Sequence, residues 1–454
     1  MKNMTLREIA SVCNGKYYGC DCNLDKEVSD VVIDSRKISK DCLFVAIKGA
    51  RVDGHDFIPQ VIEGGALCAL SEKVIEDADY SYIVVDSCTQ ALKDLAAHYR
   101  TALGIKVVGI SGSVGKTSTK EMIASVLSKK YNVLKTEGNF NNEIGLPLTI
   151  FRIREEHEVA VLEMGISHFG DMEPLASIAK PDICVITNIG YAHLENLKTR
   201  DGILKEKTDM FRFMNEGGTI ILNGDDDKLS TVEDYKGTKP VFFGTEGDRA
   251  YSACDINDMG LEGTEALFKT PDSDFKAHIY VPGAHMILNA LAGIAVGRTL
   301  GMNDSDIKEG IEALLPIAGR NNIIKTDKYT IIDDCYNANP ASMKASLDVL
   351  KKAKTRKVAI LGDMFELGEN EKEMHREIGA YAASLPVDVL ICIGDLSRNM
   401  EDGARRICSE TKIYWYKIKE AFIDDIDTIL EDGDTVLVKA SHGMEFPEII
   451  KKLK

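Results

Sequence analysis

A glycine-rich segment near residue 115 carries the residue types that hold a nucleotide phosphate. Its members are Gly112, Ser113, Val114, Gly115, Lys116, Thr117 and Ser118. An apolar run at 107–110 precedes the segment and a helical pattern begins near Thr119, which predicts a strand, a loop and a helix in succession. In such a loop, backbone N–H groups and the positive end of the helix dipole surround phosphate oxygens. We expect Lys116 to reach the β- and γ-phosphates and Thr117 to bind Mg²⁺.

The segment departs from the strict G-x-x-x-x-G-K-[ST] pattern, because Ile110 stands at the first glycine position. The alternative interpretation is an ordinary turn between a strand and a helix. The residues that follow repeat apolar side chains at helical spacing, and this favours phosphate binding. They are Met122, Ile123, Val126 and Leu127.

Composition limits the class of protein. A chain of 454 residues is expected to form two to four domains. The formal net charge of −17 argues against a general nucleic-acid binder or a protein of anionic membrane surfaces. The 11 cysteines are scattered without paired C-x-x-C motifs, which predicts reduced thiols and no zinc site. Because the start of the chain lacks a signal-peptide core and no run is long enough to span a bilayer, we expect a cytoplasmic protein without membrane insertion.

Apolar runs alternate with helical patterns along most of the chain and predict an α/β fold with mainly parallel sheets. We expect three domains, at residues 1–103, 104–316 and 317–454, with a break at 315–320. The third block lacks G-x-G-x-x-G, so a dinucleotide cofactor is not indicated. The predicted strands are 31–33, 43–47, 82–85, 107–110, 159–162, 183–186, 219–222, 329–332, 358–361, 387–393 and 436–438, and the predicted helices include 91–99 and 286–300.

Ligands of open α/β sheets bind at the carboxyl ends of the strands, so we expect binding residues directly after the predicted strands. Glu163 follows one strand and could hold Mg²⁺; the alternative is a solvated carboxylate. His193 lies in the loop after the next, although a lone histidine is more often structural. Asn141 and Asn142 lie in an amide-rich loop that suits sugar and pyrophosphate, or is a plain turn. Asp333 and Asp334 end a third-block strand and could contact ribose or a metal-bound water.

The order and spacing of these motifs together resemble the Mur ligase family over nearly the whole chain. The shared segments are Asp34-Ser35-Arg36, residues 43–49, residues 53–57, the Gly112 loop, residues 138–147, Glu163-Met164-Gly165, residues 192–195, Arg320, residues 334–340 and residues 362–368. The resemblance implies a UDP-sugar-binding α/β domain, a central ATP-binding P-loop domain and a C-terminal Rossmann-like domain. It implies an ATP-dependent ligase that joins UDP-N-acetylmuramoyl-tripeptide to D-alanyl-D-alanine through an acyl phosphate, as a monomer.

The same resemblance assigns residue roles. It gives catalytic and metal-binding roles around two Mg²⁺ ions to Lys116, Thr117, Glu163, His193 and Lys207. Lys207 corresponds to a carbamylated lysine of the family, whereas composition alone would place it on a solvated helix face. Nucleotide contacts are assigned to Asn289, Arg320, Asp334 and Tyr336. Substrate contacts are assigned to Ser35, Arg36, Lys48, Asn141, Asn142, Asn337 and Asn339.

Two positions depart from the family pattern. Met286 follows His285 where the family often has asparagine, and His442 replaces the arginine of Ser-Arg-Gly-Met. Three other functions stay open: a sister Mur ligase, a folylpolyglutamate synthetase, and a non-catalytic nucleotide switch. The block ahead of Gly112 argues against the synthetase, and the third α/β block argues against the switch.

Overall fold

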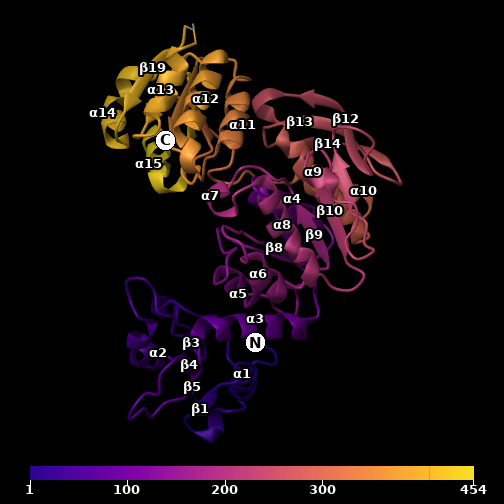
Figure 1. Cartoon of the computed structure of the whole chain (residues 1–454), viewed down its shortest axis with the longest axis vertical. Helices are drawn as coiled ribbons and strands as arrows, with labels where there is room; N and C mark the ends of the chain where they lie inside the picture. The colour runs from indigo at the N-terminus through magenta and orange to yellow at the C-terminus, as the bar shows by residue number, and fades with distance from the viewer. Residues whose placement is uncertain (408–409) are drawn as a thin grey trace. The chain divides into compact units, whose positions relative to one another are not determined.

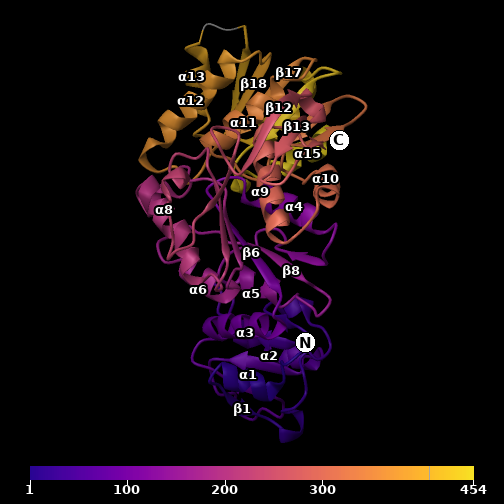
Figure 2. The same ribbon diagram turned by 90° about the vertical axis from the view of Figure 1, so that its right-hand side faces the viewer.

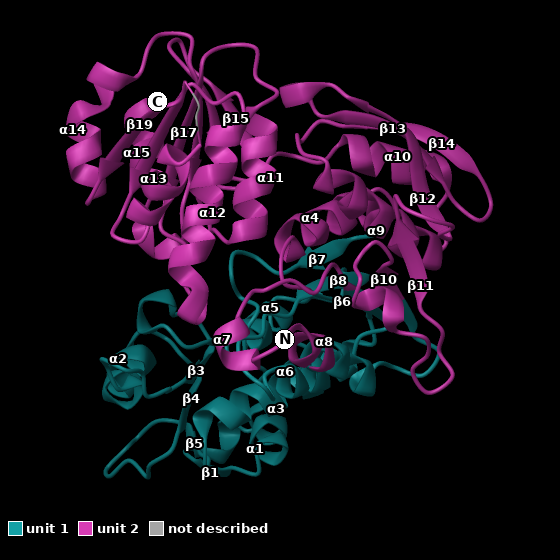
Figure 3. Ribbon diagram, turned by 45° about the horizontal axis from the view of Figure 1, so that its top comes forward, with its two compact units in different colours: residues 1–111, 131–185, 206–220 teal, residues 112–130, 186–205, 221–454 magenta. Residues whose placement is uncertain are grey.

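The computed structural model describes residues 1–407 and 410–454 and has an α/β architecture with three sheets. The chain forms two compact units, drawn in different colours in Figure 3. Unit 1 comprises residues 1–111, 131–185 and 206–220, and unit 2 comprises residues 112–130, 186–205 and 221–454.

The N-terminal sheet, indigo to purple in Figure 1, lies within unit 1. Its strand order is β1-β5-β4-β3-β2. Its strands are β1 (Lys16–Tyr18), β2 (Val31–Val32), β3 (Leu43–Val45), β4 (Cys68–Ser71) and β5 (Tyr82–Val84). All pairings are parallel except that of β1 with β5. The helices of this region are α1 (Leu6–Val12), α2 (Ile58–Glu63) and α3 (Cys88–Leu103).

The second sheet has nine strands in the order β14-β13-β12-β11-β10-β9-β6-β8-β7. They are β6 (Lys106–Ser111), β7 (Val133–Lys135), β8 (Val159–Glu163), β9 (Ile183–Ile186), β10 (Thr219–Asn223), β11 (Val241–Gly244), β12 (Tyr251–Asp258), β13 (Thr264–Lys269) and β14 (Asp274–Ile279). Strand β8 pairs in parallel with β6 and β7, and β11 with β12, whereas the pairs β12–β13 and β13–β14 are antiparallel. All residues of β8 and β9 are buried, as the unbroken apolar runs of a covered parallel sheet predict.

The helices between these strands begin with α4 (Lys116–Leu127), which starts three residues before the predicted Thr119 because the loop glycines lead directly into it. The others are α5 (Gly145–Ile150), α6 (Met172–Ala179), α7 (Leu194–Leu197), α8 (Arg200–Thr208), α9 (His285–Thr299) and α10 (Asp304–Glu312). A Cβ at Gly293 of α9 would lie 3.3 Å from Met122 of α4, so these two helices pack closely.

The C-terminal sheet lies within unit 2 and has the order β15-β16-β20-β17-β18-β19. Its strands are β15 (Asn322–Lys325), β16 (Thr330–Asp333), β17 (Lys357–Gly362), β18 (Val389–Ile393), β19 (Lys412–Tyr416) and β20 (Thr435–Lys439). Its helices are α11 (Pro340–Leu350), α12 (Glu371–Ser384), α13 (Arg398–Arg405), α14 (Lys419–Ile429) and α15 (Pro447–Leu453).

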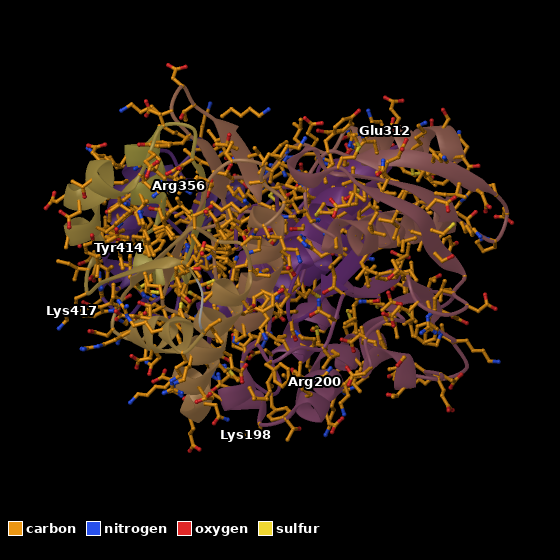
Figure 4. All side chains as sticks on the ribbon, turned by 90° about the horizontal axis from the view of Figure 1, so that it is seen from above. Lys198, Arg200, Glu312, Arg356, Tyr414 and Lys417 are labelled. Atoms are coloured by element: carbon orange, nitrogen blue, oxygen red, sulfur yellow. A yellow bond between two sulfur atoms is a disulfide. The ribbon has the colours of Figure 1, made fainter. Side chains whose placement is uncertain are left out.

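Helices cover both faces of this C-terminal sheet. Leu361 of β17 packs in one buried cluster with α11, α12 and α13, whereas its neighbour Ile360 packs in another with α14 and α15. Arg356, labelled in Figure 4, directly precedes β17 and donates over 2.7 Å to the carboxylate of Asp434, which directly precedes β20. The sheet is therefore doubly wound, as the alternation of apolar runs predicts.

Helices α12 and α13 lie side by side in Figures 1 and 2. Glycines make this approach possible: a Cβ at Gly379 would collide with the backbone carbonyl of Met400, and a Cβ at Gly403 with that of Arg376. The two backbones are therefore in direct contact.

Two further sequence expectations meet the structure here. The expectation that the thiols are reduced is wrong for Cys20 and Cys22, which form a disulfide; the short C-x-C spacing gave no signal for a structural bridge. Eight other cysteines of the described residues carry free thiols, and six of these are buried. Among the helices of residues 1–407 and 410–454, none has the length and apolar composition needed to cross a membrane.

Replacing Gly379 by alanine is expected to lower the free energy of unfolding of the C-terminal domain by about 2 kcal/mol, since rigid backbone opposes the new methyl group. Urea unfolding followed by the fluorescence of Trp415, the one tryptophan of the chain, reports on this domain. Glu377→Ala, on the exposed side of α12, is the matched control. An unchanged midpoint for Gly379→Ala would show that α12 and α13 can separate without cost.

Candidate functional site

The glycine loop is held in an anion-accepting shape by side chains from the end of β9. Val114 donates its N–H to the Asn188 Oδ1 over 2.9 Å, and Asn188 Nδ2 donates back to the Val114 carbonyl over 2.8 Å. The Thr187 hydroxyl donates to the same carbonyl over 2.7 Å. Gly112 has φ 153° and Gly115 has φ 82°, so both need glycine. The loop conformation is thus fixed by the protein itself.

Cations and an aromatic ring surround the start of α4. Lys116 Nζ donates to the Gly112 carbonyl over 2.8 Å, across the mouth of the loop. Arg320 donates to the Thr117 hydroxyl over 3.3 Å, and its guanidinium lies 4.3 Å from the ring centre of Tyr336. The Tyr336 ring lies 5.4 Å from that of His442. The structure therefore brings together four residues predicted to contact the nucleotide, which are Lys116, Thr117, Arg320 and Tyr336. His442, which differs from the family pattern, lies beside Tyr336.

Asn289 of α9 lies beside the same loop. Its Oδ1 accepts from the Thr119 hydroxyl over 2.8 Å, and its Nδ2 points to the sulfur of Met286 at 3.2 Å. Met286 thus supplies a weak acceptor where many relatives are expected to have an amide.

A buried ion pair lies behind Arg320. Lys439 Nζ donates to the Asp334 carboxylate over 2.6 Å, and both side chains are less than a tenth exposed. Asp334 also accepts from the N–H of Asn321, next to Arg320, and from the Ser346 hydroxyl. Because the carboxylate is so fully engaged, Asp334 fixes the backbone that carries Arg320.

In unit 1, Glu163 ends β8 and is 2% exposed, and its Oε1 accepts from Asn141 Nδ2 over 2.8 Å. Lys207 of α8 is also 2% exposed. The composition-based interpretation of Lys207 as a solvated residue is therefore wrong, because it faces inward from its helix. A buried lysine and a buried carboxylate are both uncommon away from functional or paired sites.

His193 opens α7 with φ 58°, a left-handed conformation that is uncommon for a residue with a side chain. Arg200, labelled in Figure 4, holds the preceding loop: its Nε donates to the Ile189 carbonyl over 2.9 Å and its guanidinium pairs with Asp227. The Nδ1 atom of His193 lies 3.1 Å from the Glu366 carboxylate, in the loop after β17.

That loop, residues 363–368, is anchored by buried polar groups. His375 Nε2 accepts from the Met364 N–H over 2.9 Å, and its Nδ1 lies 2.7 Å from the Glu371 carbonyl. Burial lowers the pKa of His375, and burial raises the pKa of Asp363 although that carboxylate accepts two N–H groups. His375 is therefore a neutral acceptor that fixes this loop.

Several residues that are predicted to contact the substrate form hydrogen bonds with the backbone of their own segment. Asn142 Oδ1 accepts from the Gly145 N–H at the start of α5, and Asn339 caps α11. Asn337 accepts from the Ala338 N–H. Lys48 is exposed and Ser35 is half-buried. The roles of these two residues and of the three asparagines stay predictions.

Arg36 forms an ion pair with Asp34, and its hydrogen bond lowers the pKa of that carboxyl to about 2. Its guanidinium stands at the surface. A role in binding an anionic substrate stays a prediction for this residue as well.

Sequence reasoning did not single out Thr187, Asn188, Glu366 or His375. Asn188 had a usable signal, because it directly follows a buried strand whose carboxyl end belongs to the same sheet as the phosphate loop. Glu366 lay in the family-like segment 362–368, which gave it no role of its own, and His375 had no signal, because its partner Met364 lies eleven residues away.

The arrangement can bind an anionic phosphate and neutralise it. Within the described part of the chain, no three His, Cys, Asp or Glu side chains are grouped as a metal site. The Glu163 carboxylate in unit 1 and the Thr117 hydroxyl in unit 2 are each a hard oxygen donor of the kind that Mg²⁺ prefers, and their metal-binding role stays a prediction.

Three family models match the chain in succession. They are described as the Mur ligase family catalytic domain (residues 27–100), the Mur ligase middle domain (residues 110–297) and the Mur ligase glutamate ligase domain (residues 319–442).

Individual relatives are similar over almost their full length. The chain is 37% identical to the UDP-N-acetylmuramoyl-tripeptide--D-alanyl-D-alanine ligase of Bacillus subtilis, with 94% of this chain and 93% of the relative covered. It superposes on the crystal structure of MurF from Acinetobacter baumannii with a TM-score of 0.89 at 30% identity, covering 99% and 98% of the two chains. The MurF ligase of Thermotoga maritima, in complex with ADP, gives a TM-score of 0.82 at 32% identity, covering 93% and 96%.

Replacing Asn188 by alanine removes both hydrogen bonds to Val114 and is expected to weaken ADP binding about tenfold, since two net hydrogen bonds are lost. Isothermal titration calorimetry measures this. Asn215→Ala is the control, because that side-chain amide donates to the Lys180 carbonyl and not to the glycine loop. Unchanged ADP affinity in Asn188→Ala would contradict the assigned role of this clamp.

Replacing His375 by glutamine is expected to abolish part of the pH dependence of stability. Since burial lowers the pKa of His375 in the folded state, its stabilising effect is complete above the unfolded pKa of about 6.5. It is lost as the pH falls towards the folded pKa, because the unfolded chain binds the proton first. Urea unfolding of both proteins between pH 8 and pH 5, read from Trp415, should give a difference that narrows at low pH. A constant difference would contradict this account.

Proposed function

Because the chain belongs to the Mur ligase family, we propose that it is the ATP-dependent ligase that adds D-alanyl-D-alanine to UDP-N-acetylmuramoyl-tripeptide in peptidoglycan precursor synthesis. The observation that carries the proposal is the phosphate loop with Lys116, Thr117 and Arg320 at one place, in a chain whose full length matches relatives of that name. The reaction is assigned to the cytoplasm, where nucleotide-linked precursors are made.

We divide the work among three domains. Residues 1–103 bind the UDP-sugar, residues 104–316 bind ATP, and residues 317–454 help to bind the incoming amine. The ranges matched by the family models fall inside these limits and support them.

The chemistry begins with a poor electrophile, the terminal carboxylate of the tripeptide. Its oxygen attacks the γ-phosphorus of ATP, the bond to the β-phosphate oxygen breaks, and an acyl phosphate and ADP result. The amine of D-alanyl-D-alanine then attacks the acyl carbon, the tetrahedral intermediate expels phosphate, and the amine loses a proton. Excluding water protects the acyl phosphate from hydrolysis.

The chain's own residues supply orientation and charge. The N–H groups of the loop, kept in place by Asn188, would surround the β-phosphate. Lys116 would move from the Gly112 carbonyl to the transferring phosphoryl group, and Arg320 would approach the same oxygens from the side of Thr117. Asn289 and Tyr336 would contact the nucleoside.

The family resemblance implies two Mg²⁺ ions, and we assign their ligands on that basis. Thr117 and the buried Glu163 would hold one, and His193 and Lys207 the other. A carbamate on Lys207 turns an ammonium into an oxygen ligand, and the 2% exposure of this side chain supports such a role. Bound Mg²⁺ supplies the positive charge that offsets repulsion between carboxylate and triphosphate.

The test is phosphate release from ATP and Mg²⁺ with the two acceptors added singly and together. We expect release to require both, with the pentapeptide product identified by mass, and Lys116→Ala to be inactive. Release that ignores D-alanyl-D-alanine would favour a sister ligase, and release without either acceptor would favour a nucleotide switch.

Replacing Lys207 by alanine is expected to lower turnover about a hundredfold, since a metal ligand is lost. Partial recovery is expected when formate or acetate is added, because a small carboxylate can take the place of the carbamate. Lys205→Ala, on the exposed side of α8, is the control. Full activity of Lys207→Ala without added carboxylate would contradict the assigned metal-binding role.

A further inference from the structure

The loop after β17 presents a carboxylate on a rigid support. Phe365 donates its N–H to the Ser441 hydroxyl over 2.9 Å, and Met364 donates to His375. Asp363 accepts from the N–H groups of Leu396 and Ser397. Residue 366 therefore follows three consecutive residues whose positions are fixed by the C-terminal sheet and its helices.

The backbone of Glu366 has a conformation that residues other than glycine rarely adopt. Its φ is 62°, and that of His193 is 58°. Left-handed backbone of this kind costs free energy for residues other than glycine and gathers at functional sites. Two such residues, far apart in the sequence and both within unit 2 (Figure 3), face each other with 3.1 Å between His193 Nδ1 and Glu366 Oε2.

The approach extends beyond this one pair of atoms. A Cβ at Gly368 would lie 3.9 Å from Cβ of Glu195, which is ordinary van der Waals contact between the two segments. The contact adds little to stability, because the Glu366 side chain is 68% exposed and exposed ion pairs contribute little. Nor do His193 and Glu366 form a metal site by themselves, since no third His, Cys, Asp or Glu of the described residues joins them.

The remaining role for Glu366 is orientation of the imidazole. A carboxylate at Nδ1 selects the tautomer that carries its proton there, and Nε2 then bears the lone pair. Metal-binding histidines are commonly fixed in this way by an outer carboxylate. We propose that Glu366 is a positioning residue, which sets the tautomer and ring orientation of His193 for Mg²⁺ binding at Nε2. The inference rests on the proposed function, which gives His193 its metal.

The partners come from different sheets. His193 lies in the loop after β9 of the nine-stranded sheet, and Glu366 follows β17 of the C-terminal sheet. The imidazole is therefore correctly oriented only while the C-terminal domain contributes its loop.

The first readout uses the metal-free protein. Long-range ¹H–¹⁵N spectra of histidine-labelled protein report the tautomer of each ring, and His193→Gln assigns the resonance among the nine histidines. We expect the Nδ1–H tautomer in the wild type, its loss in Glu366→Ala, and its retention in Glu366→Gln, whose amide oxygen still accepts. Glu369→Ala, an exposed carboxylate three residues along, is the matched control.

The second readout is the Mg²⁺ concentration that gives half-maximal pentapeptide formation. Glu366→Ala should raise it about tenfold at unchanged KM for UDP-N-acetylmuramoyl-tripeptide, and Glu366→Gln should restore most of it. An unaltered His193 tautomer in Glu366→Ala, or an unaltered Mg²⁺ requirement, overturns the inference. Failure of the proposed function is distinguishable, because the wild type would then form no pentapeptide whatever tautomer His193 adopts.

Discussion

An anion-binding loop must keep its N–H groups directed inward before any anion arrives, and in this protein Asn188 performs that work. Its side-chain amide accepts from the Val114 N–H and donates to the Val114 carbonyl, so two hydrogen bonds fix the backbone of the loop at this residue. Thr187 adds a third bond at the same carbonyl. Because the loop is already formed, the phosphate is not required to order it, and binding free energy remains for the reaction itself.

The C-terminal sheet extends this preorganisation. The pair of Lys439 and Asp334 is buried and costly to form in isolation, and extra hydrogen bonds from Asn321 and Ser346 offset the loss of solvation. In return, the segment that carries Arg320 is fixed beside Thr117. Lys116 in the first turn of α4 and Arg320, just before β15, thereby place two cations at one helix N-terminus, which suits the transfer of a phosphoryl group between anions.

Sequence alone indicated the fold well and the site unevenly. The predicted strands at 159–162 and 183–186 match β8 and β9 closely, because fully buried strands are unbroken apolar runs. The burial of Lys207 could not be predicted from composition, because the mixed charges of this helix do not indicate which face is buried. Only the family resemblance pointed to this residue. The contact of His193 with Glu366 joins two loops that are far apart in the sequence. A local sequence pattern cannot predict that two such loops come together. The disulfide of Cys20 and Cys22 was not predicted, because the C-x-C spacing is also compatible with free thiols.

The central claim is that the tripeptide carboxylate becomes an acyl phosphate before the amine attacks. Substrate labelled with ¹⁸O in that carboxylate tests the claim directly when the released phosphate is analysed by mass. Each released phosphate should carry one ¹⁸O atom, because the oxygen that attacks the γ-phosphorus leaves with it. Phosphate without the label would show that the amide forms by another route.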